Sequence, residues 1–326
     1  MGVITEREIT APVELCRPDG RLDQAAVGWT RQPLHRANLR GWGRGKRWEY
    51  WGIVTPHHIV GIVASSLDYA GVHGIYVLDR KTGEEITRDT VVPLARGAVL
   101  AERSGVGVSS VHGGGIDIEL SNDTSGTEIE ASAPGVRLSA RVALVPDHES
   151  LGVVVPWSER RFQYTVKDVG RPAVGTLTLG EREYTFDDAF AVLDHGRGKW
   201  PYAITWNWAA GSRPGLGVQF GGKWTDGTGS TENAIIVDGR IHKISDELRW
   251  NYDRGNWLRP WHITGERVEA EFLPFHTRAA HTDLLVLAND THQCFGNFRG
   301  RARADDGRWL DLDGVVGWAE ETRNRW

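Results

Sequence analysis

The sequence has little of what secreted and membrane proteins require. Its 326 residues contain two cysteines, Cys16 and Cys294, which lie far apart and match no zinc or redox spacing. Charged residues at positions 6–8 interrupt the start of the chain, where a secretion signal would carry an apolar core. The longest apolar run, at 59–64, is far short of the roughly 20 residues that span a bilayer. We therefore expect a cytoplasmic protein with free thiols and no membrane contact.

The chain also lacks an excess of charge of one sign. Its 38 basic and 43 acidic residues leave a formal net charge of −5. This balance gives no electrostatic reason to expect nucleic acid or an anionic membrane as a partner. The expected partner is a small apolar molecule, and the sequence does not indicate an oligomeric state.

Familiar catalytic motifs are missing as well. There is no Walker phosphate loop, no His-Glu-x-x-His zinc helix, no Gly-x-Ser-x-Gly elbow and no dinucleotide fingerprint. His57 and His58 are adjacent, and neighbouring residues on a strand point to opposite faces, so the pair does not suit one metal ion. We expect neither a metal site nor a cofactor.

Glycine and tryptophan, in contrast, are abundant, at 40 and 15 residues, and short apolar segments alternate with turn signals. Segments 48–55, 58–66, 72–78 and 86–93 read as four consecutive strands, and helical periodicity is hard to find. Asp-Gly pairs at 238–239 and 306–307 predict type I′ hairpin turns. Many short antiparallel strands favour barrels, which remove exposed edges.

We predict two tandem lipocalin-like antiparallel β-barrels, residues 1–155 with an extended N-terminal segment and residues 156–326. The break in strand pattern at 145–150 places this boundary. The segment 43–50 also resembles 196–202 at an offset of 153, as a duplicated barrel would.

The segment 194–208 is the densest in chemistry. Alternation along a strand places Tyr202, Trp206 and Trp208 on one face, which predicts an aromatic wall that includes Trp200. A carboxylate, an imidazole and a guanidinium precede that wall and could form a proton donor held in place. The alternative is a rim salt bridge beside a tryptophan-filled barrel core. The candidate catalytic residues from this segment are Asp194, His195 and Arg197, and Asn207 is a candidate binding residue.

A second glycine-rich segment, at 221–233, contains Lys223 and Asp226, which are candidate binding residues. It also contains Glu232, a candidate catalytic carboxyl just before a predicted strand. A solvated loop would explain the first two equally well. Near the C-terminus, Trp318 is expected to close the last strand, and Glu320 and Glu321 are expected to be surface charges.

Several of these segments resemble an uncharacterised bacterial family, number 2804 among the domains of unknown function. They are 194–208, 221–233, 292–296 and 317–321, together with Trp51-Gly52 and 67–71. That family is distantly similar to the AttH and carotenoid 1,2-hydratase group of tandem lipocalin-like domains, which also includes tocopherol cyclases and decalin-forming pericyclases. The resemblance implies the fold and transfers no catalytic residue.

Three functions are compatible with these patterns. The first is a cofactor-independent lyase or isomerase that protonates an apolar, terpenoid or polyketide substrate, with Asp194 or Glu232 as the acid and tryptophan faces stabilising a carbocation. The second is a lipocalin-type carrier that leaves its ligand unchanged. The third is a cavity whose shape alone promotes a pericyclic cyclisation. Charged residues beside the aromatic wall favour the enzyme.

Overall fold

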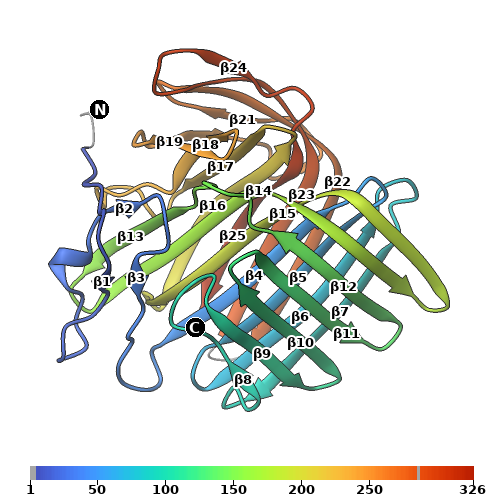
Figure 1. Ribbon diagram of the computed structural model, residues 1–326, viewed down its shortest axis with the longest axis horizontal. Helices are drawn as coiled ribbons and strands as arrows, with labels where there is room; N and C mark the ends of the chain where they lie inside the picture. The colour runs from blue at the N-terminus through green and yellow to red at the C-terminus, as the bar shows by residue number, and fades with distance from the viewer. Residues whose placement is uncertain (1–4, 285–286) are drawn as a thin grey trace.

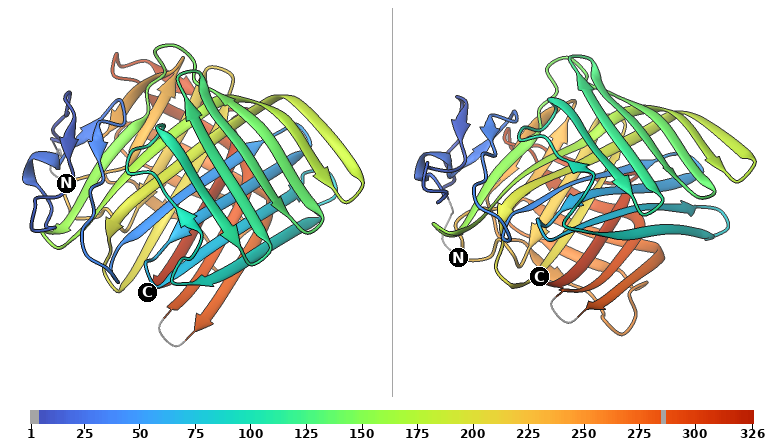
Figure 2. Two further views of the ribbon diagram at one scale, coloured as in Figure 1. Left: turned by 60° about the horizontal axis from the view of Figure 1, so that its bottom comes forward. Right: turned by 90° about the horizontal axis from the view of Figure 1, so that it is seen from below.

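A computed structural model of the protein describes residues 5–284 and 287–326, and this part of the chain contains no α-helix (Figure 1). Two large antiparallel sheets carry the fold, and each curls into a half-barrel (Figure 2). The prediction of an all-β protein with two lipocalin-like antiparallel barrels is confirmed.

The first sheet contains a four-strand meander that was predicted from alternation, followed by a second series of hairpins. Its strands are β4 (Lys46–Val54), β5 (His58–Ser66), β6 (Ala70–Asp79), β7 (Glu85–Pro93), β8 (Ala98–Val99), β9 (Gly107–Gly113), β10 (Ile116–Asp123), β11 (Gly126–Ala133), β12 (Val136–Ala143), β14 (Arg161–Leu179) and β15 (Arg182–Lys199). They lie in the order β7-β6-β5-β4-β15-β14-β12-β11-β10-β9-β8. Off this path, β13 (Leu151–Ser158) pairs with β14 and with β2 (Trp29–Thr30).

The second sheet follows in sequence. Its strands are β16 (Ala203–Arg213), β17 (Leu216–Gly222), β18 (Asn233–Val237), β19 (Arg240–Ile244), β20 (Arg249–Asn251), β21 (Trp261–Thr264), β22 (Val268–Leu284), β23 (Leu287–Arg303), β24 (Trp309–Asp311) and β25 (Val316–Arg325). Their order is β19-β18-β17-β16-β25-β23-β22-β21-β20, and β24 pairs with β23. Asp238 and Gly239 join β18 to β19 with φ values of 46° and 80°, as a type I′ turn requires. The pair at 306–307 instead lies in a longer connection, because Arg303 pairs with Trp309.

The chain passes from the first sheet to the second at residues 200–202, between β15 and β16. The predicted division after residue 155 falls inside the first sheet, because β14 and β15 both follow it and pair with β12 and β4 there. These two strands form one long hairpin that crosses the molecule, drawn in yellow-green in Figure 2. The break at 145–150 is the connection from β12 to β13.

The N-terminal segment packs against β13 and β14, on the face of the first sheet that also carries Trp51 and Leu193 (Figure 1). It contains β1 (Val13–Glu14), the 3-10 turn η1 (Gln24–Ala26) and β3 (His35–Arg36), and β1 pairs with β3 in parallel. Leu15 and Leu22 bury against Phe162 and Tyr164 of β14. This segment therefore covers a sheet face that would otherwise expose aromatic rings.

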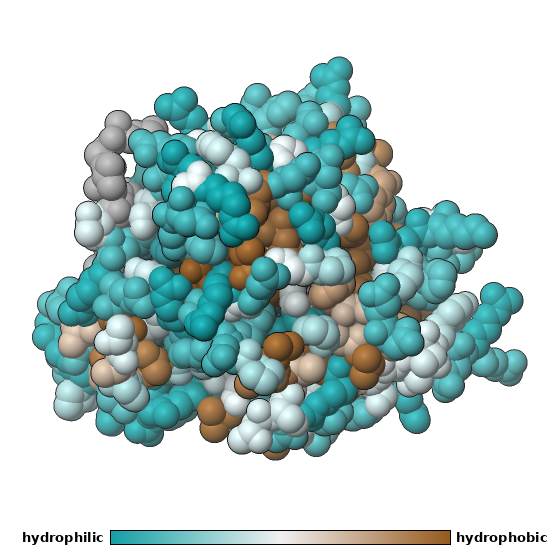
Figure 3. All heavy atoms as spheres, turned by 45° about the horizontal axis from the view of Figure 1, so that its top comes forward, coloured by the Kyte–Doolittle hydropathy of each residue, from teal (hydrophilic) through white to brown (hydrophobic). Residues whose placement is uncertain are grey.

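Strand alternation divides the core into separate layers. On β4 and β15, Trp51 and Leu193 point into the first half-barrel, whereas Tyr50 and Val192 point toward the second sheet. The second half-barrel has its own apolar interior. Hydrophilic residues predominate on the face shown in Figure 3, where apolar residues form small patches. Each half-barrel thus has an apolar interior, and a further apolar cluster lies between the two sheets.

Candidate functional site

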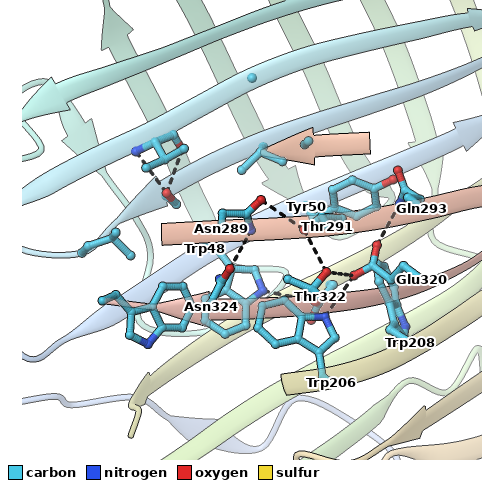
Figure 4. A pocket seen from close by; sticks show the side chains of 18 of the residues that line it. Trp48, Tyr50, Trp206, Trp208, Asn289, Thr291, Gln293, Glu320, Thr322 and Asn324 are labelled. Carbon is cyan, nitrogen blue, oxygen red and sulfur yellow. Dashed lines mark hydrogen bonds between the residues drawn. The ribbon is translucent and has the colours of Figure 1, made fainter. Parts of the chain in front are cut away.

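The candidate site is a cavity of about 470 Å³ between the facing surfaces of the two sheets. Trp48 and Tyr50 of β4 contribute to one wall, and Trp206 and Trp208 of β16 contribute to the other (Figure 4). The cavity therefore lies between the half-barrels, because their interiors are occupied by apolar side chains.

Tryptophan rings build the apolar part of this cavity. Trp200, from the connection between β15 and β16, stacks on Trp224 with ring centroids 5.3 Å apart and an interplanar angle of 14°. Its edge contacts Trp48, Trp206 and Trp326 at centroid distances of 5.5 to 5.6 Å. We call these five residues the tryptophan cluster. Such rings offer a large rigid apolar surface with a negative face.

Three buried charged side chains lie beside this cluster. Lys167 Nζ of β14 lies 3.0 Å from Asp194 Oδ2 and 3.2 Å from Glu232 Oε2, and 4.3 Å from the centroid of the Trp208 ring. Burial would lower the pKa of Lys167, but the two carboxylates outweigh it and raise that pKa. Burial and the charge of Asp194 raise the pKa of Glu232, against the opposing charge of Lys167. We call Lys167, Asp194 and Glu232 the charged triad.

Glycines allow the triad to approach its aromatic neighbours. A Cβ at Gly196 would lie 2.1 Å from Trp48 Cε2, and one at Gly221 would lie 2.2 Å from Glu232 Oε1. Trp48 Nε1 donates to Asp194 at 3.1 Å, and its ring occupies the space that a side chain at Gly196 would fill. The glycine frames seen in the sequence thus make room for packing at the cavity wall.

Glu320 of β25 is the carboxyl that sequence reasoning missed. It was expected at the surface, and the structure instead buries it in the cavity wall, where Trp206 Nε1 and Gln293 Nε2 each donate to it at 3.0 Å. Burial raises its pKa to about 7, although the hydrogen bond from Trp206 and the charge of Lys167 oppose the rise. The surface expectation for Glu321 is wrong as well, because it is buried on the opposite face of β25.

A row of polar side chains continues from Glu320 toward the end of β25. Thr322 lies beside Thr291, with their hydroxyl oxygens 2.9 Å apart, and Asn289 donates to Asn324 at 2.6 Å (Figure 4). These residues alternate along β23 and β25 and therefore share one face. The cavity thus has an aromatic side and a hydrogen-bonding side.

Two predicted catalytic residues lie outside the cavity lining. His195 and Arg197 alternate with Asp194 along β15 and point into the first half-barrel, where Arg197 donates to Glu49 at 2.9 Å. Burial and the charge of Arg197 lower the pKa of His195 to about 4. Burial would raise the pKa of Glu49, but its neighbours His195 and Arg197 lower it to about 2. Arg197 also donates to the Trp48 carbonyl at 2.6 Å, so it holds β4 in place.

The predicted binding residues divide in the same way. Trp200, Trp206 and Trp208 line the cavity, whereas Tyr202 precedes β16 and is 49% exposed. Asn207 points away from the cavity and donates to the Glu320 carbonyl at 3.0 Å.

Lys223 and Asp226 lie in the loop after β17, outside the cavity lining. Asp226 accepts a hydrogen bond from the backbone N–H of Lys223 at 2.8 Å. The Lys223 ammonium contacts Tyr252 and Glu321. Burial opposes ionisation of Glu321, but hydrogen bonds from Arg254, Lys223 and Tyr252 lower its pKa to about 2.

Among residues 5–284 and 287–326, no group of three or more histidine, cysteine or acidic side chains is arranged to hold a metal ion. In that same part of the chain no helix is long and apolar enough to cross a membrane.

The fold and the cavity define a tandem lipocalin-like protein with an aromatic and acidic site between its half-barrels. The chain belongs to the family described as domain of unknown function DUF2804, whose model matches residues 6–326. Among solved structures, a protein of Nitrosomonas europaea assigned as AttH is similar at 11% identity, over 85% of this chain and 92% of that one, with a TM-score of 0.51. Kievitone hydratase from Nectria haematococca is also similar at 11% identity, over 86% and 89% of the two chains, with a TM-score of 0.47. No curated protein sequence matches significantly.

These findings confirm the predicted family and the distant similarity to AttH. At 11% identity the likeness to AttH shows the fold alone.

Proposed function

We propose that the protein is a cofactor-independent lyase or isomerase of the hydratase or cyclase type. It protonates a carbon–carbon double bond of an apolar small molecule that lies between the two sheets. The observation that carries this proposal is Glu320, a buried carboxyl with a pKa of about 7 in the wall of an aromatic cavity. A general acid is most effective when its pKa lies near the working pH, because it is then protonated and still a good donor.

The reaction would begin with transfer of the Glu320 proton to one carbon of the double bond. The π electrons form the new C–H bond, and the adjacent carbon becomes a cation. Trp206 and Trp208 line the cavity, and a ring face stabilises such a cation by roughly 0.5 to 2 kcal/mol. Addition of water or loss of a neighbouring proton then quenches the cation, and the released proton returns to Glu320. Nothing is consumed other than the substrate and, in a hydration, water.

The charged triad has a different role in this proposal. Asp194 accepts hydrogen bonds from Trp48 and from Thr165 Oγ1, the latter at 2.9 Å, and it contacts the Lys167 ammonium. An ionised carboxylate is held in this manner. We therefore assign Asp194 to electrostatic stabilisation of the cation rather than to proton donation. Glu232, whose pKa is raised by burial and by the charge of Asp194, is the second candidate acid.

His195 and Arg197 would act only as positioning residues, through Glu49 and the backbone of Trp48.

Incubation in D₂O with a panel of terpenoid and polyketide alkenes tests the proposal. A substrate that is turned over should gain one carbon-bound deuterium per product molecule, which mass spectrometry detects. Glu320→Gln should lower turnover by about 10²- to 10⁴-fold, the usual contribution of a general acid. Glu119→Gln is the matched control, because Glu119 is exposed on β10.

Two results would overturn the enzyme proposal. A ligand that co-purifies in native mass spectrometry and stays unaltered during incubation would identify a carrier. A product that forms without solvent deuterium, at a rate insensitive to Glu320→Gln but reduced by Trp206→Ala, would identify a shape-directed pericyclic reaction.

A further inference from the structure

One cationic side chain in the cavity wall is not used by the proposed chemistry. Arg278 of β22 lines the cavity, and within the described residues no carboxylate lies within 4.0 Å of it and no hydrogen bond from its guanidinium is formed. Lys167, which also lines the cavity, differs from Arg278 because its ammonium contacts two carboxylates. Arginine is always charged at physiological pH, so a partly buried guanidinium without an anion favours an anionic ligand.

The position of this guanidinium is fixed by aromatic packing. Its central carbon lies 4.2 Å from the centroid of the Tyr76 ring. Tyr76 in turn stacks on Phe295 with centroids 5.5 Å apart and an interplanar angle of 8°. This contact with the ring face holds Arg278 in place and leaves its N–H groups free to donate.

Strand register places Arg278 in line with the proposed general acid. Arg278 pairs with Gln293 across β22 and β23, and Gln293 pairs with Glu320 across β23 and β25. Paired residues share a face of the sheet, so all three side chains are directed to the same side. Two strand spacings separate the first from the last, which is roughly 10 Å.

We propose that Arg278 binds the carboxylate of an amphipathic substrate whose apolar body lies against the tryptophan cluster. The proposal rests on the proposed function for the reaction at Glu320, and it adds the class of substrate. A carboxylate is planar and matches the donor fork of a guanidinium. The double bond would then lie roughly 10 Å from the carboxylate, at the spacing of two strands.

Two carboxyl groups of the cavity lining, Asp89 of β7 and Glu320, lie near enough to Arg278 for its charge to lower their pKa, and Asp89 is the one that the proposed reaction does not use. It lines the same cavity, and Arg278 is close enough to moderate the rise that burial causes in the pKa of Asp89. The described residues show no ion pair within 4.0 Å between the two side chains, so the guanidinium remains available. Removal of the Asp89 charge should favour a bound carboxylate.

A displacement assay tests the substrate class without any turnover. N-phenyl-1-naphthylamine, a neutral fluorescent probe, would report occupancy of the cavity at pH 8, and dodecanoate and dodecanol would compete for it. Dodecanoate should bind the wild-type protein about 10- to 100-fold more tightly than dodecanol, as a charge-assisted hydrogen bond provides. Arg278→Gln should abolish this preference and leave dodecanol binding unchanged.

Arg299→Gln is the matched control, because it removes the same charge from an exposed position on β23 and should leave the preference intact. Asp89→Asn should strengthen dodecanoate binding by about two- to fivefold, which tests the proposal even if Arg278→Gln does not fold. Equal binding of the two competitors by the wild type, or an unchanged preference in Arg278→Gln, would overturn it. Glu320→Gln should retain the preference for dodecanoate. Turnover therefore tests the proposed function, and the preference for dodecanoate tests the role of Arg278 independently.

Discussion

The Glu320 carboxyl should make the stability of the protein fall as the pH rises. Its pKa is about 7 in the folded protein and about 4.5 in an ordinary environment, because burial disfavours the charged form. Between these two values the folded state holds a proton that the unfolded chain has released. Stability therefore decreases with rising pH across this interval, and the contribution is fully present only below pH 4.5.

The size of the effect follows from the difference between the two pKa values. A difference of about 2.5 units corresponds to roughly 3 kcal/mol at about 1.4 kcal/mol for each unit. Glu320→Gln removes the titrating group and keeps a side chain of the same size. The free energy of unfolding of the variant, relative to wild type, should therefore rise by roughly 3 kcal/mol between pH 4.5 and pH 8.

Urea unfolding followed by tryptophan fluorescence, repeated at half-unit steps from pH 4.5 to pH 8.5, measures this difference directly. Subtraction of the two curves cancels the other titrating groups, which both proteins share. Glu119→Gln, which alters an exposed carboxyl, should give a curve parallel to that of the wild type. Parallel curves for Glu320→Gln would refute a buried carboxyl that titrates near neutrality.

Three further changes test the surroundings of this group. Lys167→Met should destabilise the protein by about 3 to 5 kcal/mol, because it leaves two buried carboxylates without their cation; a loss below about 1 kcal/mol in urea unfolding would contradict the charged triad. Gly196→Ala should cost about 1 to 3 kcal/mol and shift the fluorescence maximum, since its Cβ would displace the Trp48 ring; an unchanged spectrum would argue against this packing. Trp206→Phe removes a hydrogen bond that lowers the pKa of Glu320, so the basic limb of the rate profile should move to higher pH, and a shift to lower pH would contradict the proposed acid.

The strands were predictable because their signals are local. The alternating segments 48–55 and 58–66 correspond to β4 and β5, and Asp238-Gly239 forms its turn, since a strand period and a two-residue turn depend on a few neighbouring residues. The point where the chain passes from the first sheet to the second was not predictable in this way. A proline interrupts the strand pattern both at Pro146 and at Pro201. The pairing of β14 with β12, which is distant in sequence, keeps the chain in the first sheet after the first of these breaks.

The candidate site was predictable in part. Asp194 and Glu232 were selected as charges in glycine frames next to aromatics, and the structure places both in the cavity lining. Lys167 was overlooked, because Gln163, Thr165 and Lys167 alternate with apolar residues along 162–167, which is the usual pattern of a strand with one face in solvent. Its two partners come from β15 and from the residue just before β18, so no short sequence segment contains all three.

The error at Glu320 has a more general cause. Adjacent carboxylates on a strand point to opposite faces, and the expectation of surface charges assumed that one face of β25 meets solvent. Both faces are buried here, since Glu321 points into the second half-barrel and Glu320 points toward the first sheet. Where two half-barrels pack against each other, a strand at the contact has one face in its own half-barrel and the other face against the neighbouring sheet. A polar residue on either face of that strand is then buried. In such a protein a pair of consecutive acidic residues in the middle of a strand indicates a buried acid, and on β25 that pair adjoins the aromatic wall of the cavity.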